Sequence, residues 1–132
     1  MSDSDRNVIL LPVGGAPRVV TADRSIFDQA CKFAKADSVS QIPCSSWMAD
    51  KFRVALAAPA VVGTDRNVNA LASKVFGSPV HGDCILCRRP AKDEDMYGLP
   101  HRSDRYLRPF DSDTASSVLA ALGQTIEDMH HE

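Results

Sequence analysis

The residues best suited to chemistry are one histidine and two cysteines that form an H-x-x-C-x-x-C run. They are His81, Cys84 and Cys87, and His101 follows fourteen residues after the second cysteine. Thiolate and imidazole ligands at such spacing suit tetrahedral zinc. Zinc knuckles usually place Gly, Pro or polar residues between the thiols, whereas two large aliphatic residues stand there in this chain. The spacing thus leaves a zinc module that uses these four residues as an alternative, although the residues between the thiols do not favour it.

The local pattern favours a different structure, because residues 80–87 read as a strand. In an extended strand Cys84 and Cys87 point to opposite faces, and their Cα atoms lie about 10 Å apart at roughly 3.3 Å per residue. A disulfide tolerates at most about 7 Å between Cα atoms. A thioredoxin-type pair would also need a helix N-terminus at its first thiol. We expect buried thiols, no metal site, no redox pair and no cofactor.

A second candidate is a charged segment over residues 88–111. Arg102, Arg105 and Arg108 recur every three residues beside Tyr97 and Tyr106, so the cations could grip phosphates while the rings stack on bases. Five carboxylates in or beside this segment nearly neutralise it: Asp93, Glu94, Asp95, Asp104 and Asp111. We expect a solvated, salt-bridged arm, with nucleic-acid binding as the alternative.

Composition excludes several classes of protein. The 132 residues are 44% hydrophobic and 24% charged, with a net charge of −2, which is typical of one globular domain without a global field that attracts nucleic acid. The longest apolar run, Val54–Val62, is far shorter than the ~20 residues of a membrane span. The polar, acidic start lacks the features of a secretory signal, so we expect a cytoplasmic protein with reduced thiols and no membrane contact.

Strand and turn signals predict a small sheet. Apolar residues 7–13, the Gly14-Gly15 turn and the β-branched residues 18–21 indicate a hairpin. Residues 39–44, 52–57 and 80–87 have strand composition. Pro43 lacks an N–H for a ladder, which places its strand at a sheet edge.

Three segments have helical periodicity. The first runs from about Asp23 to near Asp37, and the second opens with Asn67 as its N-cap and ends at Gly77 in a left-handed conformation. In the tail, the apolar residues Val118, Leu119, Leu122, Ile126 and Met129 recur at helical spacing from Asp113 onward. This stripe needs a surface, which the same chain or another molecule could supply.

Familiar catalytic motifs are missing. The chain has no Gly-x-Ser-x-Gly elbow, no His-Glu-x-x-His pair and no glycine-rich phosphate loop. We therefore expect a protein that is not an enzyme.

A pattern of a loop glycine, an asparagine that opens a short helix, a small residue and a closing strand that begins with a glycine is formed by Gly63, Asn67, Ala70, Gly77, Gly82, Asp83, Ile85 and Leu86. In this pattern the stretch from Gly63 to Leu86 resembles a small family of phage, plasmid and algal proteins known only as a domain of unknown function. The resemblance covers about residues 7–87 and implies an architecture, without a reaction or ligand.

Together these observations predict an α+β fold. A mixed or antiparallel sheet of four to five strands, packed by two helices, forms a core over residues 7–87, followed by a charged arm over 88–111 and an amphipathic C-terminal helix over 112–132. We expect a non-enzymatic binding or adaptor protein that contacts a protein partner or itself. The alternatives are a subunit of a larger assembly that docks through its C-terminal arm and helix, and the zinc or nucleic-acid module. The candidate contact residues are Trp47, Arg66, Asn67, Arg102, Arg105, Tyr106 and Arg108.

Overall fold

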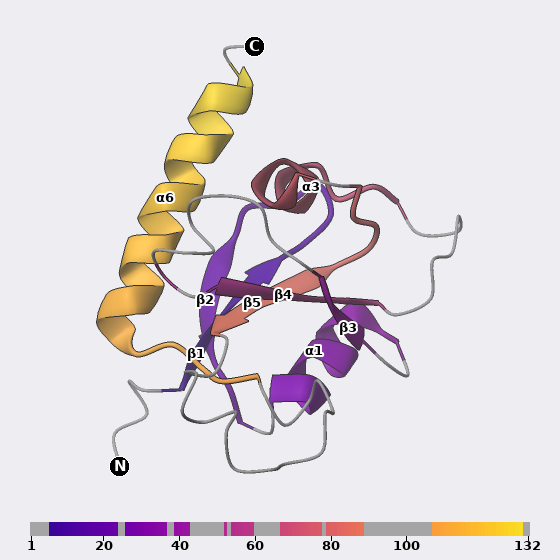
Figure 1. The fold of residues 1–132 in the computed structure, drawn as a ribbon, viewed down its shortest axis with the longest axis vertical. Helices are drawn as coiled ribbons and strands as arrows, with labels where there is room; N and C mark the ends of the chain where they lie inside the picture. The colour runs from indigo at the N-terminus through magenta and orange to yellow at the C-terminus, as the bar shows by residue number, and fades with distance from the viewer. Residues whose placement is uncertain are drawn as a thin grey trace.

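The computed structural model describes residues 6–23, 26–36, 39–42, 52, 54–59, 67–77, 79–88 and 107–130. Over these ranges the chain forms the expected α+β fold, with a sheet of five strands in the order β2-β1-β5-β4-β3 (Figure 1). Each neighbouring pair of strands is antiparallel. The strands are β1 (Asn7–Leu11), β2 (Arg18–Thr21), β3 (Val39–Ile42), β4 (Val54–Pro59) and β5 (Cys84–Arg88), and the helices are α1 (Ile26–Ala34), α3 (Ala70–Phe76) and α6 (Ser112–His130).

The sheet is the middle of three layers. Alternate side chains of the central strands enter two separate hydrophobic clusters, one under α3 and α6 and the other under α1. In β5, for example, Leu86 belongs to the first cluster and Ile85 to the second. Because both faces of the central strands are buried, these strands are apolar except for Asn7 at the start of β1 and Arg88 at the end of β5, and they do not alternate with polar residues.

The predicted edge strand and hairpin are confirmed. β3, which Pro43 follows, is the last strand of the sheet, and β1 and β2 pair as a hairpin in which Val8 faces Val20. The strand expected over 80–87 is shorter, because β5 begins only at Cys84. Gly82, two residues earlier, has φ +87°, which interrupts the extended chain.

α6 answers the question that the sequence left open, because it packs on the sheet of its own chain. Its buried side chains are Ala115, Val118 and Leu122, and it lies against β1, β2 and α3. Asp111 caps its N-terminus by accepting a hydrogen bond from the N–H of Thr114 at 2.7 Å. Beyond Leu122 the helix continues past the sheet (Figure 1). No helix in the described ranges is both long and apolar enough to cross a membrane.

The residues before α6 are attached to the core. Leu107 and Phe110 are buried. The backbone N–H of Asn7 donates to the carbonyl of Phe110 at 3.0 Å, and the N–H of Phe110 donates back at 2.7 Å. This pairing fixes the point from which α6 starts across the sheet.

Candidate functional site

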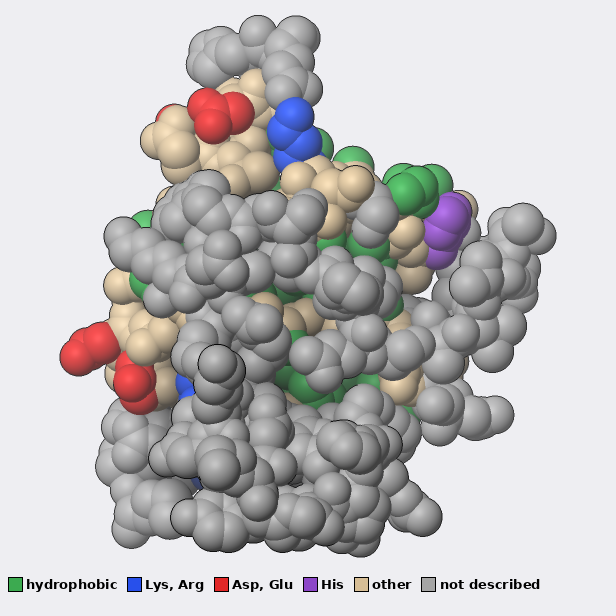
Figure 2. Space-filling view, viewed as in Figure 1, with side chains coloured by type: hydrophobic (Ala, Val, Ile, Leu, Met, Phe, Trp, Pro, Cys, Tyr) green, Lys and Arg blue, Asp and Glu red, His purple; other side chains and the backbone are tan. Residues whose placement is uncertain are grey.

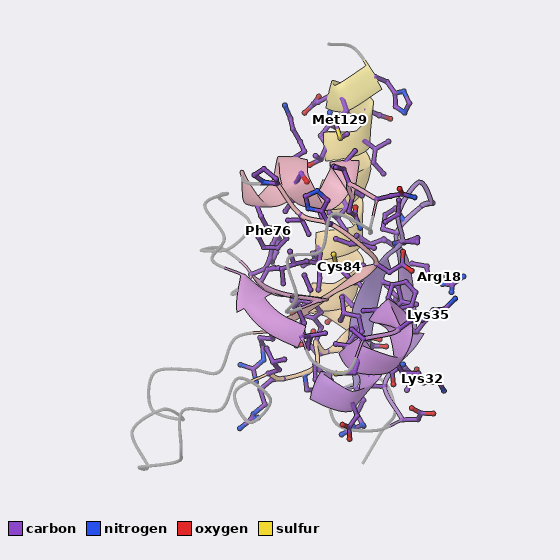
Figure 3. All side chains as sticks on the ribbon, turned by 90° about the vertical axis from the view of Figure 1, so that its right-hand side faces the viewer. Arg18, Lys32, Lys35, Phe76, Cys84 and Met129 are labelled. Carbon is purple, nitrogen blue, oxygen red and sulfur yellow. The ribbon has the colours of Figure 1, made fainter. Side chains whose placement is uncertain are left out.

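The two cysteines of the H-x-x-C-x-x-C run point to opposite faces of the sheet, as the strand geometry predicts. Cys84 packs in the cluster under α3 and α6 (Figure 3), and Cys87 packs in the cluster under α1 on the other face. Burial raises the pKa of each thiol to about 12. At Cys84 the charge of Asp83 raises the pKa further, while a hydrogen bond from Asn69 lowers it. Both groups are therefore neutral thiols near pH 7 and serve as packing groups.

The histidine of the run, His81, is not grouped with other metal-ligating side chains among the described residues. His81 is half-buried, and its backbone forms an isolated bridge with Val68. Among the residues that the structure describes, no three His, Cys, Asp or Glu side chains lie together in a way that would hold a metal ion. His101, the fourth candidate ligand, falls outside these residues.

Most of the predicted contact residues also fall outside the described ranges, namely Trp47, Arg66, Arg102, Arg105 and Tyr106. Their placement on a contact surface stays a prediction. Arg108 is half-buried, and its backbone pairs with that of Arg88 through two hydrogen bonds of 2.7 and 2.9 Å. At this position the arm is anchored to the end of β5.

The prediction that Asn67 caps the second helix is wrong, because the cap is Asn69. Asn67 is exposed, and Val68, which would begin a helix capped by Asn67, is 55% exposed and precedes α3. The Oδ1 atom of Asn69 accepts a hydrogen bond from the N–H of Ala72 at 3.2 Å. The carbonyl of Asn67 accepts a hydrogen bond from the N–H of Gly82, and the N–H of Asn69 donates to the carbonyl of Val80. This pairing keeps the backbone extended up to Asn69. The predicted end at Gly77 is confirmed, with φ +73°.

Asn69 also ties together three parts of the chain. Its side chain is almost completely buried, at 1% exposure. The Nδ2 atom donates to the carbonyl of Leu11 at 2.8 Å and to that of Gly82 at 3.0 Å. Nearby, the N–H of Val13 donates to Oδ1 of Asp83 at 2.8 Å. These bonds hold the β1–β2 loop, the start of β5 and the start of α3 in fixed relative positions.

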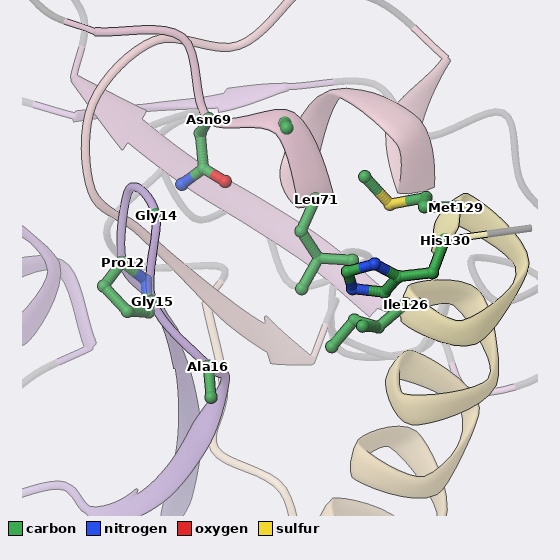
Figure 4. Close-up of a pocket in the computed structure, with 10 residues that line it drawn as sticks. Pro12, Gly14, Gly15, Ala16, Asn69, Leu71, Ile126, Met129 and His130 are labelled. Carbon is green, nitrogen blue, oxygen red and sulfur yellow. The ribbon is translucent and has the colours of Figure 1, made fainter. Parts of the chain in front are cut away.

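A pocket of about 530 Å³ lies above this network, between the β1–β2 loop and the two helices on the same face of the sheet (Figure 4). Its floor is Asn69, and Leu71 of α3 faces the last turns of α6. The remaining lining residues are Pro12, Gly14, Gly15, Ala16, Ala70, Ile126, Met129 and His130.

The lining is mainly apolar, and its two sides differ in character. On the helical side, Ile126 and Met129 project toward Leu71, and the His130 ring lies beside them (Figure 4). On the loop side, Gly14 and Gly15 have no side chains, so the backbone itself forms this wall of the pocket. Gly14 has φ +71°, and no atom lies near the position that its Cβ would take. Asn69 already has partners for its amide hydrogens in Leu11 and Gly82. The pocket can therefore bind an apolar group and offers few polar contacts.

Sequence reasoning missed this pocket, although it identified each element that forms it. The lining residues come from positions 12–16, 69–71 and 126–130, which are distant along the chain. Two signals were available: a glycine pair at a hairpin turn, and apolar residues Ile126 and Met129 that continue the stripe of α6 beyond the sheet.

Comparison of the chain with family models, with curated proteins and with solved structures finds no match. The resemblance to the phage, plasmid and algal family stays a prediction.

Proposed function

We propose that this chain is a non-enzymatic binding protein that takes up an apolar anchor of a partner protein in the pocket between the β1–β2 loop, α3 and α6. The observation that carries the proposal is the pocket itself. Its volume of about 530 Å³ lies within the roughly 300–1,000 Å³ of typical binding sites, which are concave and mostly apolar.

The construction of the walls supports this role. The floor is rigid because the Asn69 side chain makes hydrogen bonds to Leu11, Gly82 and Ala72. The opposite wall includes Met129, whose flexible, polarisable side chain suits the surface of a binding site. A rigid floor beside an adjustable apolar wall fits recognition of a Leu-like or Phe-like side chain.

The chemistry of the lining supports binding over catalysis. Among the described residues that line the pocket, His130 has the titratable side chain, and none of the others carries a carboxylate or a thiol. The two cysteines of the H-x-x-C-x-x-C run, Cys84 and Cys87, are buried thiols whose pKa values are raised to about 12, so they are not activated nucleophiles. An acid–base pair or an activated nucleophile would need a second group within hydrogen-bond reach.

The assembly role considered as an alternative has less support from α6. That helix uses Ala115, Val118 and Leu122 to cover its own sheet. The apolar side chains left over at its end, Ile126 and Met129, already line the pocket.

Methyl NMR tests the proposal with N-acetyl-leucinamide as a mimic of the anchor. In protein labelled at isoleucine and methionine methyl groups, saturable shifts are expected at Ile126 and Met129. Ala70→Trp, at an exposed position on the pocket rim, should fill the space and abolish the shifts. The matched control is Ala120→Trp, at an exposed position on α6 that does not line the pocket. Absent shifts in the native protein, or shifts that survive Ala70→Trp, would refute the proposal.

A further inference from the structure

The outer edge of β2 has no partner strand among the described residues. β2 is the first strand in the order β2-β1-β5-β4-β3, so β1 lies on one side of it and no described strand lies on the other. Val19 and Val20 are half-buried, and Arg18 and Thr21 are exposed. An open strand edge is a template for pairing with another chain, and natural proteins protect such edges with charges, prolines or covering loops. The four residues of β2 include one charge, on Arg18, and no proline.

The pairing of β2 with β1 shows which backbone groups face outward. The N–H of Ala22 donates to the carbonyl of Arg6, in the same register that pairs the two strands. Successive residues of an antiparallel strand point their backbone groups to opposite sides, so Val20 bonds to β1 as Ala22 does. The N–H and C=O groups of Val19 and Thr21 therefore point away from the sheet, and no described residue bonds to them.

This pattern of donors and acceptors is complementary to itself. When a second copy approaches with its β2 antiparallel and a twofold axis at Val20, Val19 of each copy faces Thr21 of the other. Both outward N–H groups of each copy then meet a C=O group of the other copy. Arg18 faces Ala22 of the second copy, and the two Arg18 residues stand about 13 Å apart at roughly 3.3 Å per residue. The register therefore opposes no two like charges directly.

The helix beside β2 leaves room for a second copy. α6 packs against β2 on one face of the sheet. Its carboxylates stand at its two ends, where acidic groups are visible in Figure 2, and residues 114–126 carry no charge. The exposed side chains from Ser116 to Gly123 are small. Two α6 helices can therefore approach above the paired strands without opposing carboxylates in their middle turns.

We propose that the chain forms a symmetric dimer in which the two β2 strands pair across a twofold axis at Val20 and join the two sheets into one. A second copy is the occupant because it brings the same outward-facing groups at the matching spacing. A contact between identical surfaces occupies the edge in both copies, so it closes at two chains and does not extend into a fibre. This inference goes beyond the proposed function, because none of residues 18–21 lines the pocket.

Cysteine cross-linking of the full chain tests the register. Opposed residues of a non-hydrogen-bonded antiparallel pair have Cα atoms about 4.5 Å apart, which a disulfide can span. Val20→Cys should therefore form a disulfide-linked dimer under mild oxidation. Arg18→Cys is the matched control, because its two Cα atoms would lie about 13 Å apart, beyond the roughly 7 Å that a disulfide tolerates. It should cross-link no more than the native protein, whose own cysteines set the background.

A second pair of variants tests whether the backbone makes the contact. Thr21→Pro removes an outward N–H but no bond to β1, whereas Thr21→Ala keeps the N–H and shortens the side chain. In sedimentation equilibrium, the native protein should change from 14.3 kDa to twice that mass as its concentration rises. Thr21→Pro should weaken the dimer about thirtyfold, because one hydrogen bond per copy is lost, and Thr21→Ala less than about threefold. Circular dichroism shows whether each variant is folded, and cross-linking alone decides if Thr21→Pro is not.

Several results would overturn the proposed dimer. One is a native protein that stays monomeric up to about 1 mM. Equal cross-linking of Val20→Cys and Arg18→Cys, or a dimer that a folded Thr21→Pro variant does not weaken, would show that another surface makes the contact. An assembly of more than two chains would contradict the closed symmetry. Binding of N-acetyl-leucinamide tests the pocket separately, so the two proposals can fail independently.

Discussion

Replacing the buried Asn69 by alanine should destabilise the fold far more than replacing an exposed asparagine would. The substitution removes the N-cap of α3, which is worth about 1 kcal/mol. It also leaves the carbonyls of Leu11 and Gly82 without the amide that now bonds to both. Each buried carbonyl without a partner costs about 1–3 kcal/mol, so the two carbonyls and the lost cap together lower the free energy of unfolding by about 3–7 kcal/mol.

Urea unfolding followed by circular dichroism measures this loss, and two further variants isolate its parts. Asn67→Ala is the matched control, because the same residue type two positions earlier is exposed and offers its backbone carbonyl, not its side chain, to Gly82; a change within about 0.5 kcal/mol is expected. Asn69→Asp keeps an oxygen for the cap but cannot donate when ionised, so it should remain strongly destabilised at neutral pH. Equal destabilisation by Asn67→Ala and Asn69→Ala, or a loss of less than about 1 kcal/mol for Asn69→Ala, would contradict the role of the Asn69 side chain.

Three further predictions concern the thiols and the cap of α6. In the folded protein at pH 8, iodoacetamide should modify half-buried Cys31 well before Cys84 or Cys87, as read by peptide mass spectrometry; equal rates would contradict the burial that raises their pKa values to about 12. The folded-state pKa of each thiol is above its ordinary value, so the thiols ionise first in the unfolded chain. The free energy of unfolding should therefore hold up to about pH 9 and fall above it, by about 1.4 kcal/mol per thiol at pH 10. The double variant Cys84→Ala, Cys87→Ala should lose this fall, and the same pH dependence in the variant would contradict the prediction. The hydrogen bond from Thr114 lowers the pKa of Asp111, so the stability that the ionised cap contributes is present at neutral pH and is lost as the pH falls through that lowered pKa. Asp111→Ala should therefore cost about 1 kcal/mol at pH 7 and progressively less as the pH falls; a cost that does not fall with pH would contradict a cap by the ionised carboxylate.

Much of the fold could be predicted because its rules are local. Runs of β-branched and aliphatic residues indicated the strands, and the alternation of β5 correctly placed Cys84 and Cys87 on opposite faces. Gly77 ended its helix as predicted, since a left-handed residue at that position favours glycine. The spacing of apolar residues after Asp113 likewise predicted α6.

The errors arose where long-range contacts decide between local alternatives. Asn67 and Asn69 are both good caps, and the choice between them depends on backbone pairing with Val80 and Gly82, more than ten residues away. The pocket depends on three segments that meet only in the folded chain. Likewise, the helical period of α6 could not show that Val118 and Leu122 cover the sheet while Ile126 and Met129 extend beyond it.

The most direct test of the central claim is an isotope-filtered NOE experiment on the protein bound to N-acetyl-leucinamide. We predict contacts between the leucine methyl groups of this unlabelled ligand and the methyl groups of Leu71, Ile126 and Met129. Contacts to Val68, which is exposed outside the pocket, without any to these three residues would contradict the claim.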